Sequence, residues 1–197
     1  MPKPSRFPVS SHQRKRGCVR NIGLLGLLII IMLLAWFYGR FTDQREILPA
    51  GTSKVAVTDG DSFAIDKRRL RLDGIDAPEY RQTCLDENGS VWECGKASRA
   101  ALEQIMLEPG LTCTAEAQDR YSRSIATCSN IRIADLAAAQ VLAGMAVSDE
   151  FYGMRSYGTE EDQARAAKRG IWRGEFTQPS EWRAAHPALQ TKTVPAE

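Results

Sequence analysis

Several ligand patterns and charge distributions are scarce or absent in this sequence. There is no Cys-x-x-Cys pair, and neither of the two histidines lies near the cysteines of residues 84–128, which disfavours a structural zinc site. No internal repeat is present. Residues 1–45 hold eight of the 26 Lys and Arg and one of the 24 acids, a net +7, which leaves −5 for residues 46–197. The predicted folded part therefore lacks the basic surface that tight, extended nucleic-acid binding needs.

The N-terminal part predicts a membrane anchor. Residues 1–21 form a basic, Pro- and Ser-rich tail that we expect to be disordered. Residues 22–38 contain no charged side chain and, at about 1.5 Å per helical residue, span roughly 25 Å, near the short limit for a bilayer helix. Trp36 and Tyr38 suit the far interface. Residues 39–52 then form a short polar linker.

The position of the positive charges predicts the orientation of this anchor. Because Arg14-Lys15-Arg16 precedes the apolar segment, the N-terminus is expected in the cytoplasm and the folded part outside it. The alternative is a cleaved signal peptide. Against that alternative, Trp36-Phe37-Tyr38 is bulky, and no small-x-small cleavage site follows the apolar segment.

The cysteines agree with export to an oxidising compartment. Cys18 lies in the basic tail, and the other four lie in the predicted folded part, where three pairings are possible. Residues 111–115 and 125–128 resemble antiparallel strands joined by a short turn. This arrangement favours a Cys113–Cys128 bridge and leaves Cys84–Cys94 as the second. Buried free thiols are the alternative, but an oxidising compartment favours bridges.

The remaining pattern predicts an α+β domain at residues 53–184, followed by a disordered tail at 185–197. Of the 197 residues 43% are hydrophobic and 25% are charged, which suffices for one well-buried core. Alternation and turn residues predict strands that end at residue 59 and that cover 62–65, 70–72, 111–115 and 125–128. Apolar spacing and caps predict helices at 95–107, 136–143 and 160–169. Five strands interrupted by a helix indicate an OB-type β-barrel with about three helices, preceded by the one transmembrane helix.

Acidic residues gather in the first three of these strands and the loop after them. Residues 57–79 contain Arg71 and, among their acids, Asp59, Asp61, Asp73, Asp76 and Glu79. The predicted meander places Asp61, at a hairpin end, near the acids that follow the third strand. Carboxylates gathered this closely repel one another unless a metal ion or an arginine lies among them.

From about residue 54 to 172 the chain resembles the thermonuclease, or staphylococcal-nuclease-like, family, as a membrane-anchored bacterial member. The resemblance rests on four motifs in order: Asp59-Gly60-Asp61-Ser62, Arg71-Leu72-x-Gly74-Ile75-Asp76-Ala77-Pro78-Glu79, Asp119-Arg120-Tyr121-Ser122-Arg123 and Arg169-Gly170-Ile171-Trp172. Asp-Gly-Asp alone is weak, but the four together are specific. The resemblance implies an OB-type barrel and calcium-dependent hydrolysis of phosphodiester bonds in DNA and RNA.

The resemblance also implies a metal site. Asp61 and Asp76 fall on the family's calcium-binding carboxylates. Ala77 falls where the family often has Thr and uses the backbone carbonyl, which the substitution preserves. Asp59 falls near the metal without a settled role. Calcium is a hard cation that takes oxygen ligands of these kinds, so the residue types agree with Ca2+ independently of the family.

The catalytic residues implied by the resemblance are two arginines and one acid. Arg71 and Arg123 fall on the phosphate-binding arginines, and their planar guanidinium groups suit a five-coordinate phosphorus better than lysine does. Glu79 falls on the general base, where it would orient or deprotonate the attacking water. The chain departs from the family at Ser122, usually Gly, which could change the direction of Arg123, and in the short hairpin between Asp61 and Arg71.

The main alternative is a non-catalytic OB-fold module in the envelope that binds nucleic acid or protein. The chain keeps every acidic and arginine position of the resemblance, and its predicted domain is acidic, so both observations favour the enzyme. The sequence therefore predicts an endonuclease in the bacterial inner (cell) membrane. The protein would cross this membrane once, with the catalytic domain periplasmic or extracellular.

Overall fold

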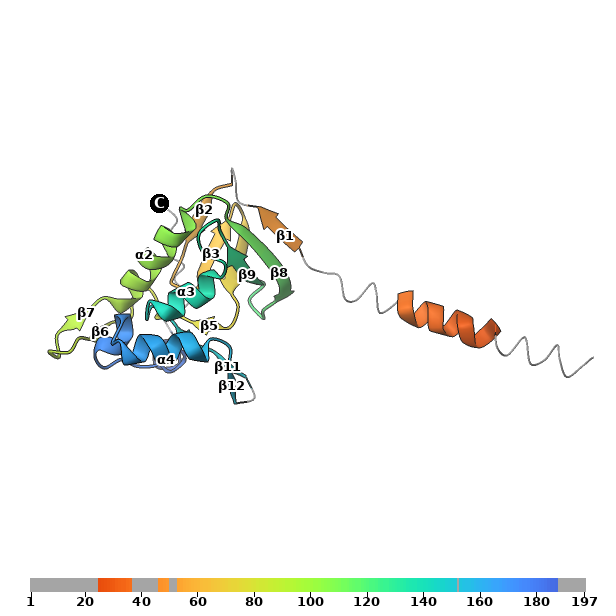
Figure 1. The fold of residues 1–197 in the computed structure, drawn as a ribbon. Coiled ribbons are helices and arrows are strands. Elements are labelled where there is room, and N and C mark those ends of the chain that lie inside the picture. The colour runs from red at the N-terminus through yellow and green to blue at the C-terminus, as the bar shows by residue number, and fades with distance from the viewer. Residues whose placement is uncertain (1–24, 37–45, 50–52, 152, 188–197) are drawn as a thin grey trace, which may run out of the picture. The chain divides into compact units, whose positions relative to one another are not determined.

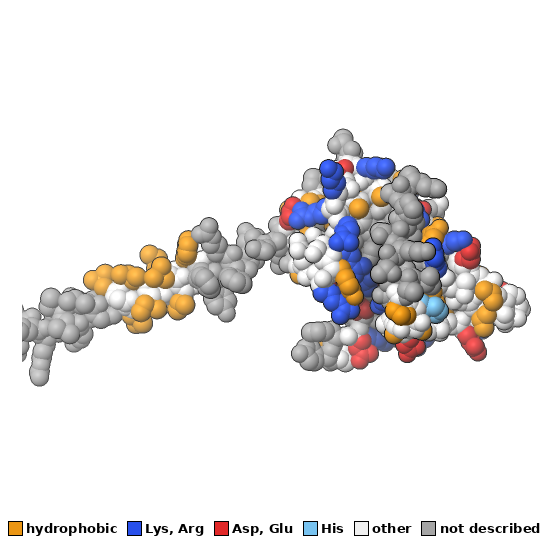
Figure 2. Space-filling model, turned by 180° about the vertical axis from the view of Figure 1, so that it is seen from behind, with side chains coloured by type: hydrophobic (Ala, Val, Ile, Leu, Met, Phe, Trp, Pro, Cys, Tyr) orange, Lys and Arg blue, Asp and Glu red, His pale blue; other side chains and the backbone are white. Residues whose placement is uncertain are grey.

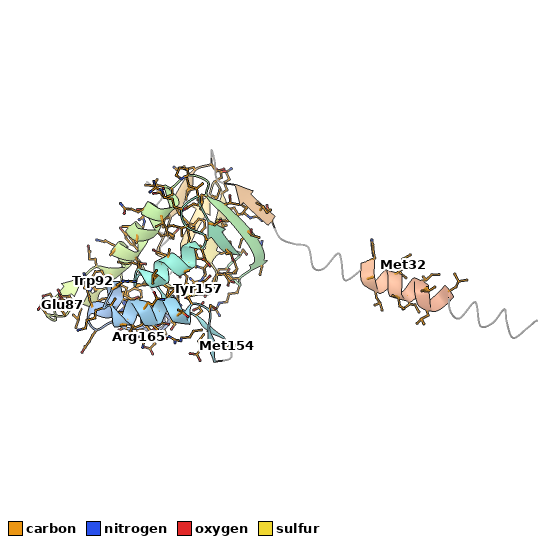
Figure 3. The ribbon with its side chains drawn as sticks, viewed as in Figure 1. Met32, Glu87, Trp92, Met154, Tyr157 and Arg165 are labelled. Carbon is orange, nitrogen blue, oxygen red and sulfur yellow. A yellow bond between two sulfur atoms is a disulfide. The ribbon has the colours of Figure 1, made fainter. Side chains whose placement is uncertain are left out.

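A computed structural model describes residues 25–36, 46–49, 53–151 and 153–187 (Figure 1). The chain divides into two compact units, residues 1–44 and 45–197. In the first unit residues 25–36 form a helix with exposed apolar side chains, among them Met32 (Figure 3). No helix within the described ranges is long and apolar enough to cross a membrane. The basic tail and residues 22–24 and 37–38 of the predicted anchor lie outside those ranges.

The second unit is built on a six-stranded sheet that curls into a half barrel (Figure 1). In spatial order the strands are β1 (Glu46–Pro49), β8 (Thr112–Gln118), β9 (Ser124–Ser129), β4 (Arg68–Leu72), β3 (Ser62–Ile65) and β2 (Val55–Val57). All neighbours are antiparallel except β4 and β9, which are parallel. The five predicted strands are therefore present, and the mixed α+β fold is consistent with the OB type.

Strand β1 lies within the segment predicted to be a linker. Its residues pair antiparallel with β8, so that Leu48 is opposite Cys113. Leu48 packs against the core, whereas Ile47 is exposed. A strand forms here because the outer edge of β8 offers unpaired backbone groups and one apolar contact. This strand was not predicted from the sequence because the residues that flank it are polar.

Four α-helices and one 3-10 helix belong to the described part of the second unit. They are α2 (Cys94–Met106), α3 (Leu136–Leu142), α4 (Gly158–Ala166), the 3-10 helix η1 (Gly170–Arg173) and α5 (Pro179–Ala185). Two of them, α2 and α3, contribute residues to the core. Helix α3 contacts β9, α2 and α4, and it lies in front of the sheet in Figure 1. The side chains of Phe63, Leu70 and Leu72 are almost fully buried in this core. The three predicted helices are present, whereas η1 and α5 had not been predicted.

Three two-stranded ladders complete the domain. They are β5 (Ile75–Asp76) with β10 (Val147–Ser148), β6 (Cys84–Leu85) with β7 (Val91–Trp92), and β11 (Glu150–Phe151) with β12 (Met154–Arg155). The first ladder corrects the prediction that residues 75–79 are entirely loop. Ile75 is fully buried, and β10 pairs with this segment at Ile75 and Asp76. The Ile75 carbonyl accepts from the Arg71 side chain, so this buried backbone group has a partner.

Both predicted disulfide bridges are present. Cys113 and Cys128 lie opposite each other on β8 and β9 and are bonded, as the predicted strand pairing requires. Cys84 and Cys94 are bonded across the β6–β7 hairpin. The Cys113–Cys128 bridge joins residues 15 apart, and the chain-entropy model assigns a loop of that size about 3 kcal/mol of stabilisation.

Tyr157 fixes the segment that leads into α4 (Figure 3). Its hydroxyl donates a hydrogen bond of 3.0 Å to Asp135, whose carboxylate also accepts from the amides of Ala137 and Ala138 at the start of α3. Burial, followed by the neighbouring Asp135, raises the pKa of Tyr157 above its ordinary value. Asp135 is thus the N-cap of α3, which begins at residue 136 as predicted, and it joins α3 to the segment that leads into α4.

Candidate active site

A cleft of about 930 Å³ opens beside β3 and β4 and contains all three predicted catalytic residues. Arg71, Glu79 and Arg123 line it, together with Asp59. Arginine and aromatic side chains make up much of the remaining wall: Arg69, Tyr80, Arg81, Arg120, Tyr121, Trp182 and Arg183. Figure 2, seen from the side opposite to Figure 1, shows Lys and Arg side chains gathered in a band on this face of the domain.

The loop between β2 and β3 carries Asp59 and Asp61 and is held by two helices. A Cβ at Gly60 would lie 1.7 Å from the Ser98 hydroxyl of α2, so only glycine permits this close approach. The Gly60 carbonyl accepts a 2.8 Å hydrogen bond from the side-chain amide of Gln140 on α3, which is buried. Packing against α2 and α3 therefore fixes the position of both carboxylates.

Asp61 is buried and fully bonded. Its Oδ2 accepts from the Arg71 guanidinium at 2.7 Å and from the Ala77 amide at 3.1 Å, and its Oδ1 accepts from the Ser62 hydroxyl at 2.6 Å. These contacts bring together three residues predicted for one site: Asp61, Arg71 and Ala77. Strand pairing of β3 with β4, which sets Ser62 opposite Arg71, produces this arrangement.

Asp76 lies at the end of β5 and is also buried. Its Oδ1 accepts from Arg71 Nη2 at 2.8 Å, so Arg71 bridges the two predicted metal-binding carboxylates. Arg71 also donates to the Ile75 carbonyl at 3.0 Å. The predicted approach of Asp61 to Asp76 is therefore real, and an arginine lies between them, as gathered carboxylates require.

Glu79 follows the β5 segment and rests against the start of α2. A Cβ at Gly95 would lie 1.8 Å from the Glu79 carbonyl oxygen, which explains why glycine occupies the second position of this helix. The Glu79 backbone amide donates to the side-chain oxygen of buried Gln82 at 3.2 Å, and the Gln82 backbone amide donates to the Glu79 carbonyl at 2.7 Å. The backbone of Glu79 is thereby fixed while its carboxylate faces the cleft.

Arg123 is directed into the cleft by a tight turn between β8 and β9. Asp119 accepts from the amides of Tyr121 and Arg123 and, at 2.7 Å, from Arg123 Nε. Arg123 Nη1 donates to the Ser62 hydroxyl at 3.0 Å. Ser122 adopts a left-handed conformation with φ 60°, so the turn that usually contains glycine forms with serine as well.

Arg183 on α5 is a site residue that sequence reasoning missed. Its Nη1 and Nη2 donate to Oδ1 and Oδ2 of Asp76, both at 2.8 Å, and Nη1 also donates to Glu79 Oε1 at 3.0 Å. A helix-start signal was available in the sequence: Pro179 occupies the first turn and Glu181 follows. Nothing local, however, indicated that this helix would reach residues about 100 positions away.

The carboxylates of the site perturb one another. Burial, followed by the charge of Asp61, raises the pKa of Asp59 well above its ordinary value. Burial also acts to raise the pKa of Asp61, but Arg71 and several hydrogen bonds lower it overall. Burial raises the pKa of Glu79 despite the opposing effect of Arg183. Of these three carboxylates, Asp61 is the one whose pKa the site lowers.

The carboxylate oxygens of the site are suitable ligands for a hard cation, although guanidinium groups bond to these oxygens in this structure. Within the part of the chain that the structure describes, no group of three or more His, Cys, Asp or Glu side chains is arranged to hold a metal ion. Three carboxylates (Asp61, Asp76, Glu79) pair here with two arginines (Arg71, Arg183), which leaves an excess of negative charge, and Asp59 accepts from the Asp61 amide beside them. Carboxylate oxygens under this excess are what Ca2+ prefers.

Known proteins resemble more than half of this chain. The family model described as staphylococcal nuclease homologue matches residues 69–174. The succinoglycan biosynthesis protein ExoI of Rhizobium meliloti (strain 1021) is 33% identical over 123 residues, which cover 62% of this chain and 64% of that protein. The protein named "Probable staphylococcal-like nuclease CAN1" of Oryza sativa subsp. japonica is 30% identical over 145 residues, 71% of this chain and 40% of that protein.

An uncharacterized 38.1 kDa protein of Capnoides sempervirens is 28% identical over 144 residues, 71% of this chain and 39% of that protein. This chain thus spans less than two thirds of the length of each of these curated relatives. The residues matched by the family model include Arg71, Asp76, Glu79 and Arg123 of the cleft, while Asp59 and Asp61 precede them. Because this match covers more than half of the 197 residues, the chain belongs to the family of staphylococcal nuclease homologues.

Proposed function

We propose that this protein is a calcium-dependent nuclease that hydrolyses phosphodiester bonds in DNA, RNA or both. The observation that carries the proposal is the convergence of Arg71, Glu79 and Arg123 on one cleft. Membership of a nuclease family supports the same reaction. Asp61, Asp76 and the carbonyl of Ala77 would hold the cation. When bound, Ca2+ neutralises phosphate charge and lowers the pKa of a water molecule.

The residues of the chain supply the remaining chemistry. Arg71 and Arg123 enter the cleft from β4 and from the turn before β9, where they donate hydrogen bonds to the equatorial oxygens of the five-coordinate phosphorus. Glu79 accepts the proton of the attacking water as the water oxygen bonds to phosphorus. The P–O bond to the leaving oxygen breaks, and this oxygen takes a proton from solvent. Asp59 lines the cleft beside these groups.

Charge argues against the alternative of a binding module that does not cut. Such a module depends on basic surface and the release of counterions from the nucleic acid. Residues 46–197 carry a net −5, and three arginines of the cleft (Arg71, Arg123 and Arg183) are paired with carboxylates. Brief, local engagement of one phosphate suits this charge distribution better than extended binding.

A digestion experiment tests the proposal. The purified full-length protein should cut single- or double-stranded DNA, or RNA, in millimolar calcium, and a chelator should abolish the cutting because Asp61 and Asp76 then lack their cation. Cleavage is measured on end-labelled oligonucleotides of each type. Binding of these oligonucleotides without cleavage in millimolar calcium would contradict the enzyme and support the binding module.

We further propose that residues 22–38 anchor the protein in the bacterial inner membrane, with the nuclease domain in the periplasm or outside the cell. The uncharged segment after Arg14-Lys15-Arg16 supports this proposal, as do two disulfide bridges, which persist in oxidising compartments.

The location is tested with a fusion and a fractionation. A reporter enzyme that is active only after export should be active when fused at Pro195, and the full-length chain should stay in the membrane fraction. Truncation near residue 38 would show that the apolar segment is a cleaved signal peptide.

A further inference from the structure

Arg183 occupies the carboxylate oxygens that the proposed function assigns to the metal. Its two terminal nitrogens bond to both oxygens of Asp76 at 2.8 Å, and one of them also bonds to Glu79 at 3.0 Å. Calcium binds carboxylate oxygens at about 2.3–2.6 Å. Asp76 Oδ1 already accepts from both Arg71 and Arg183, and a guanidinium beside the metal repels it because both are positively charged. Calcium and Arg183 therefore oppose each other's binding at Asp76.

The two arginines at Asp76 differ in how firmly they are held. Arg71 lies on the interior strand β4, where it bonds to Asp61 and to the Ile75 carbonyl as well, and its side chain is 15% exposed. Arg183 lies on α5 near the end of the described chain, and its side chain is 28% exposed. Arg183 is accordingly the cation that can leave without disturbing the sheet.

Helix α5 is attached mainly at its start. Pro179 is buried, and the buried Gln82 side chain donates to the Thr177 carbonyl at 2.7 Å. Over residues 180–187 only Trp182 and Arg183 are half-buried, and the others are exposed. A seven-residue helix is too short to be stable in isolation, so its position over the cleft depends on the contacts of these two side chains.

Helix α5 also separates two cavities. Ser180 and Arg183 line the cleft of about 930 Å³ on one side and a second cavity of about 470 Å³ on the other. Arg71 is part of both walls, while Asp76 lines the second cavity. Movement of Arg183 away from Asp76 would therefore join the two cavities and widen the approach to the site.

We propose that Arg183 is a positioning residue that competes with the metal for Asp76 and thereby sets the calcium concentration the site requires. With Arg183 bonded, α5 is held over the cleft; with metal at Asp76, Arg183 leaves and α5 is released. This inference rests on the proposed function, because Asp76 is there a metal ligand. It adds a helix that lies beyond the residues matched by the family model.

Calcium affinity is the direct test. In isothermal titration of the full-length protein with CaCl2, Arg183→Ala should lower the Kd for calcium about tenfold relative to wild type, which corresponds to about 1.4 kcal/mol. Arg183→Lys should give an intermediate Kd, because lysine keeps the positive charge but cannot make the bidentate contact with the Asp76 carboxylate. Arg132→Ala is the matched control: Arg132 pairs with Glu108 away from the cleft, and its removal should leave the Kd unchanged.

Hydrogen exchange provides a readout that a merely structural role would not change. The amides of Trp182 and His186 bond within α5, so calcium should accelerate their exchange in the wild-type protein. In Arg183→Ala the same amides should exchange rapidly before calcium is added.

The possible outcomes separate this inference from the proposed function. Equal Kd values for wild type and Arg183→Ala, with cleavage intact, overturn this inference alone. Exchange in α5 that calcium does not change also overturns it alone. Absence of calcium binding by both proteins overturns it together with the calcium requirement of the proposed nuclease.

Discussion

Replacing Arg71 with alanine should lower the free energy of unfolding by about 3–5 kcal/mol, because it leaves buried carboxylates without their partner. Arg71 is 15% exposed and bonds at 2.7 Å to Asp61 and at 2.8 Å to Asp76, whose side chains are 3% and 7% exposed. Arg183 still neutralises Asp76 in this variant, but Asp61 has no second guanidinium within its bonds. The cost therefore arises mainly at Asp61.

Urea unfolding of the variants measures this effect. The Arg132→Ala control removes an arginine that is 71% exposed, and such surface pairs contribute about 0–1 kcal/mol. The double variant Arg71→Ala/Asp61→Ala should lose less than the sum of the two single variants, because it removes the unpaired charge as well. A loss in Arg71→Ala no larger than in Arg132→Ala would show that water reaches Asp61 and replaces the guanidinium.

Local patterns were sufficient to predict most of the fold. Alternating residues in β3 and β4, the turn at residues 119–122 and the Asp135 cap each depend on a few neighbouring residues, and each is present. The pairing of Cys113 with Cys128 followed from the predicted hairpin, since residues facing each other on paired strands are close enough to be bridged.

The elements that escaped prediction depend on distant contacts. Strand β1 forms because the edge of β8 is available, and β5 forms because β10 lies beside it. Neither segment has a pattern of its own long enough to be recognised. Helix α5 is similar: its seven residues have a proline at the start, but its place over the cleft comes from Asp76 and Glu79.

In the candidate site, too, the residues within local motifs were predicted, whereas a partner from a distant segment was not. The predicted meander places Asp61 near Asp76. Two carboxylates can lie this close only when a cation or an arginine lies between them. The structure satisfies this condition with Arg71, which was already assigned to the site, and with Arg183, which was not. The residue types at the motif positions therefore predicted which side chains of the motifs lie together in the site. They could not predict a partner contributed from outside the motifs.

Replacing Arg123 with alanine should lower turnover about 100- to 1,000-fold, with little change in substrate affinity. A donor directed at charge that develops only in the transition state contributes to the chemical step rather than to ground-state binding. The structure directs Arg123 toward the site. Its Nε donates to Asp119 at 2.7 Å, and its Nη1 donates to the hydroxyl of Ser62, the neighbour of Asp61, at 3.0 Å. The left-handed Ser122 preserves the turn that carries Arg123.

Turnover and KM of the Arg123→Ala variant are measured on a defined oligonucleotide, with Arg132→Ala as the control. A second variant, Ser122→Gly, restores the residue usual in the family and should keep wild-type turnover, because glycine adopts the same left-handed conformation without strain. Both should unfold at urea concentrations near that of the wild type, since Arg123 lies at the cleft surface. If Arg123→Ala instead turns over as fast as the wild type, Arg123 does not contact the reacting phosphate, and one of the other arginines of the cleft must take that role.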